Sequence, residues 1–69
     1  MHPVTLTANQ RKVFDILEHA DAPLGAYAIQ GQIGFRTPVQ VYRALETLMD
    51  LGLVKKLESL HAYIRVSPE

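Results

Sequence analysis

The sequence contains no cysteine among its 69 residues. This absence excludes disulfides and zinc sites built on cysteine thiolates. No apolar run approaches the roughly 20 residues needed to cross a membrane. The first five residues also lack the basic and apolar segments of a signal peptide. Together these absences predict a soluble, cytoplasmic protein with no membrane partner.

Neither sign of charge is in excess, because seven Lys and Arg residues balance seven Asp and Glu residues. Neutralisation of phosphates by Lys and Arg supplies most non-specific affinity for nucleic acids, so this balance argues against a strong non-specific binder. The distribution of charge matters more than its sum. Four acids, Asp15, Glu18, Asp21 and Asp50, come late in predicted helices. A basic face with an acidic back is therefore one arrangement that the sequence permits.

The length predicts one small domain, spanning residues 1–69. A chain of this size buries only about 60% of its unfolded surface. Its core is then expected to supply no more than about 3–5 kcal/mol of net stability.

Hydrophobic periodicity predicts helices at about residues 8–20, 26–33 and 38–51. Two β-prone runs follow at about 53–57 and 62–66, with residues 58–61 as a hairpin loop. No strong turn dipeptide marks this loop, so the sequence leaves the register of the hairpin open. The element order predicts a mainly α (α+β) fold, a winged helix-turn-helix with three helices and a two-stranded β-hairpin wing.

Two helix starts carry the capping-box pattern Thr-x-x-Gln, at Thr7–Gln10 and at Thr37–Gln40. In the second, Thr37 is expected to cap the helix and Pro38 to occupy its first position, where a missing N–H does no harm.

The third helix has an apolar stripe at helical spacing, formed by Val41, Ala44, Leu45 and Leu48. Val39, Tyr42, Arg43 and Glu46 must then point outward. A helix with a sharp start and with Gln, Tyr and Arg on its first exposed turns is suited to entering a DNA groove. The predicted core comprises Val13, Phe14, Ile16, Leu17, Leu24, Ile29, Ile33, Val41, Leu45, Leu48, Leu51, Val54 and Ile64.

Residues 6–11 read Leu-Thr-Ala-Asn-Gln-Arg, residues 23–27 read Pro-Leu-Gly-Ala-Tyr, and residues 38–45 read Pro-Val-Gln-Val-Tyr-Arg-Ala-Leu. Taken in order, these segments resemble the ferric-uptake-regulator (Fur) family: its LTxxR opening, the xxSAY start of its second helix and its PPTVYRAL recognition helix. Residues 48–54 and the Glu58-Ser59 pair resemble its helix end and wing. The Ala26-Tyr27 and Glu58-Ser59 features favour the zinc-uptake-regulator (Zur) branch. The resemblance covers about residues 6–63 and implies an N-terminal winged-helix DNA-binding domain.

The sequence departs from the family in three respects. Gln40 replaces the usual threonine, and the link between the second and third helices is about one turn shorter than usual. The sequence also ends after the wing, without the dimerisation domain and its His- and Cys-rich metal sites. No cofactor is therefore expected in this chain, and zinc or iron(II) would be bound only through such a C-terminal domain.

The resemblance implies that Tyr42 and Arg43 contact DNA. Arginine can pair bidentately with guanine O6 and N7, and tyrosine can pack on a thymine methyl or reach a phosphate. The alternative is an Arg43–Glu46 ion pair beside a half-buried Tyr42. The resemblance also places Tyr27 near DNA, against the alternative of a partly buried residue of the second helix. Gln40 could read adenine, although the capping box by itself would explain its presence.

Phosphate contacts are expected from Arg36 and Thr37 at the start of the third helix, where free N–H groups favour anions. Lys55 and Lys56 lie beside the wing, and only one of them is expected to face DNA because neighbouring strand residues point to opposite faces. Arg11 is a further candidate, with an Arg11–Asp15 ion pair as its alternative.

No catalytic or metal-binding constellation is visible. His2, His19 and His61 are scattered, so neither a metal site nor an enzyme is predicted. The function predicted is sequence-specific binding of double-stranded DNA by a metal-responsive bacterial repressor that acts at the nucleoid. Its expected site is an AT-rich pseudo-palindrome, bound by a homodimer in the full-length context. The alternative, favoured by the zero net charge and by a wing tip without Lys or Arg, is a winged-helix module for protein–protein interaction.

Overall fold

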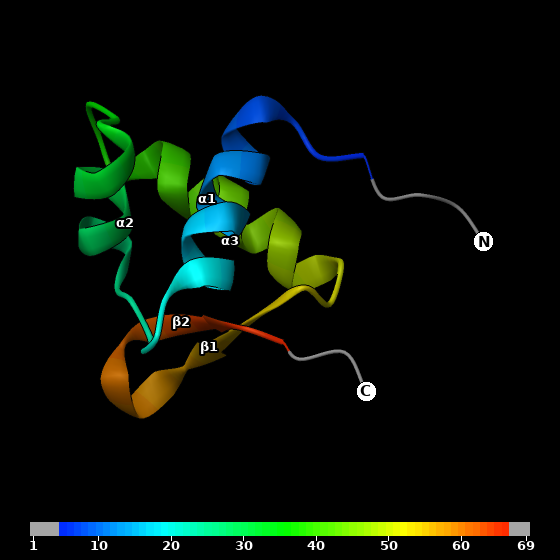
Figure 1. Cartoon of the computed structure of the whole chain (residues 1–69), viewed down its shortest axis with the longest axis vertical. Coiled ribbons are helices and arrows are strands. Elements are labelled where there is room, and N and C mark those ends of the chain that lie inside the picture. The colour runs from blue at the N-terminus through cyan, green and yellow to red at the C-terminus, as the bar shows by residue number, and fades with distance from the viewer. Residues whose placement is uncertain (1–4, 67–69) are drawn as a thin grey trace.

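The structure, a computed structural model, describes residues 5–66 as three helices followed by an antiparallel hairpin (Figure 1). The helices are α1 (Ala8–His19), α2 (Ala26–Ile33) and α3 (Val39–Asp50). The strands are β1 (Val54–Leu57) and β2 (Ala62–Arg65), joined by the short 3₁₀ helix η1 (Glu58–Leu60). The predicted α+β winged helix-turn-helix is confirmed, and each predicted boundary lies within one residue of the observed one.

The capping box predicted for α1 is present. Thr7 has extended backbone angles, φ −66° and ψ 165°. Its hydroxyl accepts a hydrogen bond from the Gln10 N–H at 3.2 Å, and the Gln10 side-chain oxygen accepts one from the Thr7 N–H at 3.0 Å. Two backbone donors at the helix start are thus satisfied by side chains.

The capping box predicted for α3 is wrong. The cap position is Pro38, with helical angles φ −73° and ψ −11°, and no side chain makes a capping hydrogen bond. The Tyr42 N–H donates to the Pro38 carbonyl at 2.9 Å, so the helix begins one residue later than expected. A capping box needs an N–H on the cap residue, and proline has none. Thr37 lies outside this cap, and the Gln40 side chain has no N–H of Pro38 to accept from.

The end of α3 forms a Schellman motif. Gly52, with φ 77°, takes the left-handed position that favours glycine. The Leu53 N–H donates to the Leu48 carbonyl at 2.9 Å, and the Gly52 N–H donates to the Met49 carbonyl at 3.0 Å. Leu51 becomes the C-cap and is 45% exposed, so its predicted place in the core is wrong. Leu53, beyond the glycine, packs against the core instead.

The core lies between the three helices and the inner face of the hairpin. Its buried members are Val13, Leu17, Ala26, Ile29, Val41, Ala44, Leu45, Leu48, Val54 and Tyr63. Partly buried side chains around them include the predicted Phe14, Ile16, Leu24 and Ile33.

The wing differs from the prediction in which residues face inward. Tyr63 is buried and Ile64 is 37% exposed, so the predicted burial of Ile64 is wrong. The strands pair Val54 with Arg65 and Lys56 with Tyr63. Leu24 adds a bridge on the other edge of β2: its N–H donates to the Tyr63 carbonyl at 3.0 Å, and the Tyr63 N–H donates to the Leu24 carbonyl at 2.8 Å. This bridge fixes Tyr63, and with it the inward face, to the segment between α1 and α2.

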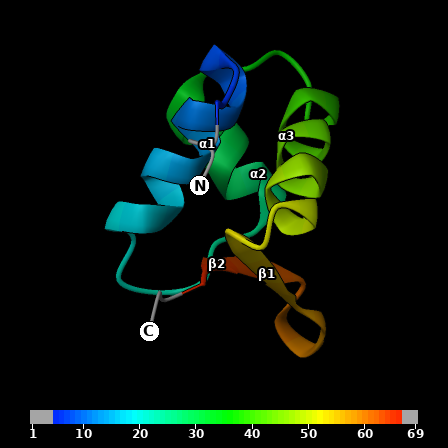
Figure 2. The ribbon, with the colours of Figure 1, turned by 90° about the vertical axis from the view of Figure 1, so that its right-hand side faces the viewer.

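α3 forms one side of the molecule, with α1 on the opposite side (Figure 2). None of the helices in the described part of the chain combines the length and apolarity needed to span a bilayer.

Candidate nucleic-acid interface

The outer face of α3 carries the side chains predicted to read DNA. Its inner face is buried in the core, through Val41, Leu45 and Leu48 at 0% exposure. On the opposite face Tyr42 is 46% exposed and Val39 is 52% exposed, and Arg43 and Gln40 are exposed as well. The division of α3 into a buried face and an exposed face follows from the helical spacing of the apolar stripe.

Arg43 is not engaged in the ion pair with Glu46 that was its alternative role. Within residues 5–66 the ion pairs are Arg11–Asp15 and Lys56–Glu58, and neither includes Arg43. Tyr42 beside it is 46% exposed, as the half-buried alternative expects, and the exposed half of its ring still faces outward. Both side chains are therefore available to a ligand.

A shallow polar hollow of about 280 Å³ lies where the start of α1 meets the outer flank of α3. Gln40 and Arg43 line it from α3, and Thr7, Asn9 and Gln10 line it from α1. Ala44 and Thr47 complete its lining. Asn9 and Thr47 are candidate contacts that the sequence did not indicate, and Val39, predicted to point outward, is exposed nearby on α3. A larger hollow of about 620 Å³, between the end of α1 and α2, contains none of the predicted site residues.

The turn between α2 and α3 presents Arg36 and Thr37, both exposed. α2 ends at Gly34, whose φ of 87° reverses the chain, and the Gly34 N–H donates to the Gln30 carbonyl at 2.8 Å. The Gln30 side-chain amide donates to the Phe35 carbonyl at 3.1 Å and holds the turn. Arg36 thus lies directly before the start of α3, on a braced turn.

Tyr27 lies on the first turn of α2 and is 71% exposed. Its alternative, partial burial against the core, does not describe this position. An exposed tyrosine ring offers both an apolar surface and a hydroxyl to a ligand.

Arg11 makes the ion pair that was its alternative role. Its Nε lies 3.4 Å from the Asp15 carboxylate, and the two side chains are 65% and 46% exposed. A pair this exposed contributes only a few tenths of a kcal/mol. It does not prevent the guanidinium from also meeting a phosphate.

Lys55 and Lys56 lie on opposite faces of β1. Lys56 pairs with the buried Tyr63, and its ammonium lies 3.8 Å from the Glu58 carboxylate. Lys55 pairs with Ile64 on the outer face and is exposed. Among the described residues, the Lys56 ammonium has an ion-pair partner and the Lys55 ammonium has none.

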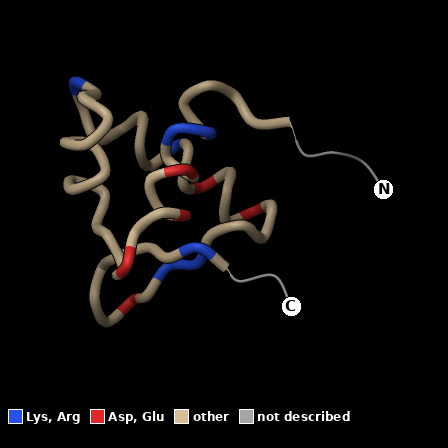
Figure 3. The backbone as a smooth tube through the Cα atoms, viewed as in Figure 1, with Lys and Arg blue, Asp and Glu red and all other residues tan. Residues whose placement is uncertain are grey.

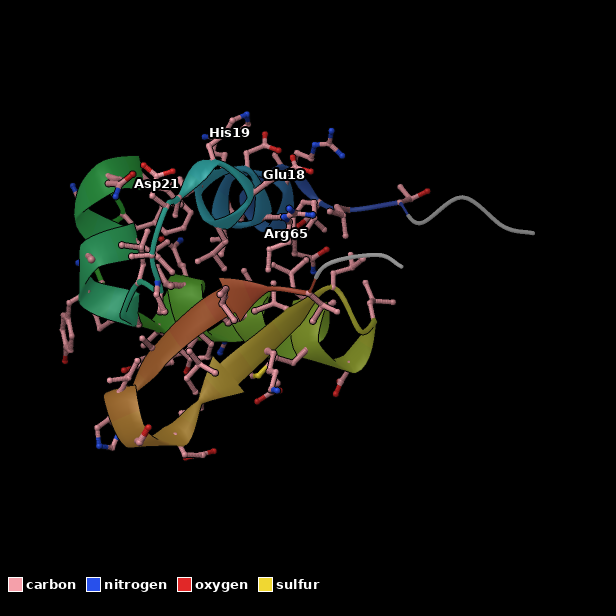
Figure 4. The ribbon with its side chains drawn as sticks, turned by 60° about the horizontal axis from the view of Figure 1, so that its bottom comes forward. Glu18, His19, Asp21 and Arg65 are labelled. Carbon is pink, nitrogen blue, oxygen red and sulfur yellow. The ribbon has the colours of Figure 1, made fainter. Side chains whose placement is uncertain are left out.

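Charge is distributed unevenly over the molecule. Lys and Arg residues are spread over α1, the α2–α3 turn, α3 and the wing rather than gathered in one patch (Figure 3). Glu18 and His19 lie on the side of α1 that faces away from α3, and Arg65 reaches from β2 toward α1 (Figure 4). Glu46 and Asp50 nevertheless lie exposed on α3 itself. The separation into a basic face and an acidic back is therefore only partial.

Metal-ligating side chains do not gather in the part of the chain that the structure describes. Among residues 5–66 no group of three or more His, Asp or Glu side chains could hold a metal ion. The His19 ring nitrogen Nδ1 hydrogen-bonds the Asp15 carbonyl at 2.8 Å, and His61 is exposed in the wing. His2 lies outside the described residues.

Comparison with solved structures gives two matches over almost the whole chain. Holo XcZur superposes with a TM-score of 0.85 and 32% sequence identity, covering 97% of this chain and 48% of that one. The predicted resemblance to the zinc uptake regulators is confirmed. A zinc uptake regulator complexed with zinc and DNA is also similar, with a TM-score of 0.78 and 28% identity over 96% of this chain and 49% of that one.

The Zur-like chain spans about half the length of the zinc uptake regulators it matches. No family model and no curated protein matches it. The second of these structures is a complex with zinc as well as DNA. Residues 5–66 of the present chain hold no group of side chains that could bind a zinc ion.

Proposed function

We propose that this chain binds double-stranded DNA sequence-specifically, as the DNA-binding part of a zinc-type, metal-responsive repressor of the bacterial cytoplasm. α3 would enter the major groove, where Arg43 pairs with a guanine and Tyr42 packs on a thymine methyl or reaches a phosphate. The observation that carries the proposal is the outer face of α3, where these two side chains are adjacent and exposed. Recognition helices read bases mainly through residues near their N-terminus, as both of these are.

Backbone contacts would come from Arg36 before α3, Lys55 on the outer face of the wing and Arg11 on α1. Thr37 and Tyr27 are further exposed candidates. Two copies would occupy an AT-rich pseudo-palindrome, one for each half-site. The homodimer and the zinc switch would belong to the full-length context. The similarity to a regulator complexed with zinc and DNA supports this proposal and favours a regulator over an enzyme.

A titration of fluorescent AT-rich palindromic duplex at two salt concentrations tests the proposal. We expect weak binding that falls as salt rises, because phosphate contacts release counterions. Arg43→Ala should weaken binding by roughly 5- to 150-fold, the range for losing one bidentate base contact.

Lys12→Ala is the matched control for this titration, because it also removes one exposed positive charge. Lys12 lines a hollow against α2, with Gln32 and Ile33, and lies outside the candidate interface. It should change the affinity far less than Arg43→Ala. The proposal fails if the wild-type chain binds no duplex at low salt, either alone or as a forced dimer.

A protein-interaction module is the second candidate function. It is favoured by apolar side chains that the wing exposes, with Leu60 61% exposed and Ile64 37% exposed. In that case the duplex titration would be negative, and Leu60→Ser would abolish retention of a protein partner without changing the fold.

A further inference from the structure

The Gln40 side chain has no structural task in the described part of the chain. It is exposed, and α3 has no side-chain capping bond. The side chains of residues 5–66 that form hydrogen bonds belong to Thr7, Gln10, His19 and Gln30. The Gln40 amide, with two donor hydrogens and an acceptor oxygen, is therefore open to a ligand.

Gln40 and Arg43 line the same hollow from α3. Residues three apart on a helix are surface neighbours, with Cβ atoms about 5–6 Å apart. Along the axis they are separated by about 4.5 Å, from three rises of about 1.5 Å. Successive base pairs are about 3.4 Å apart. A helix lying in a groove can thus bring these two side chains to neighbouring base pairs.

Two of the three α1 residues that line the hollow are already hydrogen-bonded to each other. Thr7 and Gln10 are bound to each other in their capping box, at 3.2 and 3.0 Å. Ala44 lies between the polar residues of α3 and adds no hydrogen-bonding group. The hollow therefore keeps a fixed edge on α1, and Gln40 and Arg43 on α3 are unengaged, as are Asn9 and Thr47 beside them.

We infer that Gln40 is a specificity-determining residue that reads an adenine next to the guanine read by Arg43. The inference rests on the proposed function and adds to it a base preference at one position. Adenine offers an N7 acceptor and an N6 donor in the major groove, which the carboxamide matches bidentately. Guanine offers two acceptors there, and cytosine offers one donor. A threonine at this position could not make the bidentate pair, because its side chain carries a single hydroxyl.

Selection from a pool of duplex DNA with randomised sequence tests the inference, followed by sequencing of the bound fraction at low salt. We expect wild-type chains to enrich a site in which an adenine adjoins the guanine. Gln40→Thr should lose about tenfold of the preference for adenine at that position, within the range for one bidentate pair. The neighbouring guanine should stay enriched.

Gln40→Glu provides a change of specificity rather than a loss. A carboxylate accepts from cytosine N4, so cytosine should replace adenine at that one position. Gln32→Ala is the matched control, since Gln32 is an exposed glutamine of α2 that lines only hollows away from α3. It should leave both preferences intact. Unchanged helical circular dichroism shows that each variant is folded.

The outcomes separate this inference from the proposed function. If the wild type enriches a site and Gln40→Thr enriches the same site, Gln40 does not read a base, although DNA binding stands. A uniform loss of affinity over all sequences also overturns the inference, because it indicates a phosphate contact. If the wild type enriches nothing, both fail.

Discussion

The starts of α1 and α3 share the pattern Thr-x-x-Gln but use it differently. At α1, Thr7 and Gln10 satisfy each other's backbone N–H groups. At α3, Pro38 takes the cap position, and no capping side-chain bond forms. The cap of α3 lies one residue later than the pattern places it, at Pro38, which has no N–H for a side chain to accept from.

The same sequence pattern can therefore leave different side chains free at the two helix starts. α1 holds its start through side chains, which are then unavailable to a ligand. α3 holds its start through the packing of its buried stripe, and its first exposed side chains stay available. Variants of the two helix starts and of the packing beneath α3 test this difference.

Loss of packing under α3 should have the largest effect. Leu45→Ala removes a side chain with 0% exposure and should lower the free energy of unfolding by about 2–5 kcal/mol. This approaches the whole net stability of a domain of this size, about 3–5 kcal/mol, so the variant should be largely unfolded at 25 °C. Urea titration followed by circular dichroism measures the loss. Val39→Ala, on the exposed face of the same helix, should stay within about 0.5 kcal/mol of the wild type.

Removing the two threonines tests the comparison directly. Thr7→Ala should lower the free energy of unfolding by about 1 kcal/mol, because it removes a cap, and the melting temperature by about 4–8 °C. Thr37→Ala, an identical change at an exposed position, should be nearly neutral. Equal losses in thermal melts of the two variants would show that the second threonine caps α3 after all.

The smallest effect is expected at the exposed ion pair of α1. Arg11→Ala should change the free energy of unfolding by no more than a few tenths of a kcal/mol, since the Arg11–Asp15 pair is solvent-exposed. The double variant with Asp15→Ala gives the coupling energy in a double-mutant cycle. A coupling above 1 kcal/mol would mean that the pair stabilises the helix start as much as the cap does.

Helix positions and the two faces of α3 could be predicted from the sequence because local periodicity encodes them. The wing could not be predicted in the same way. In a strand, a change of one residue exchanges the two faces. Because no turn dipeptide marks the register, the sequence predicts Ile64 inside, where the structure has Tyr63. The inward face of the wing is fixed by the bridge between Tyr63 and Leu24, and Leu24 is distant from the wing in sequence. Leu51 was misplaced because the Schellman motif turns the chain at Gly52 and brings Leu53 inward.

The candidate site, like the wing, can be predicted from the sequence only where local periodicity determines it. The exposure of Tyr42 and Arg43 follows from the apolar stripe of α3 and was correctly predicted. The hollow beside them depends on the start of α1 packing against α3, a tertiary contact between residues 7–10 and 40–47. No local sequence pattern indicates this tertiary contact, so the sequence does not predict Asn9 and Thr47 as contacts.

The Leu24–Tyr63 bridge has a consequence for the order of folding. Its two hydrogen bonds join residues far apart in sequence, and forming them requires closing a long loop, whose entropic cost precedes any gain. We therefore expect the helices to associate first and the wing to dock late. In hydrogen exchange, the amides of Leu24 and Tyr63 should open together, as one cooperative unit that joins the wing to the helices.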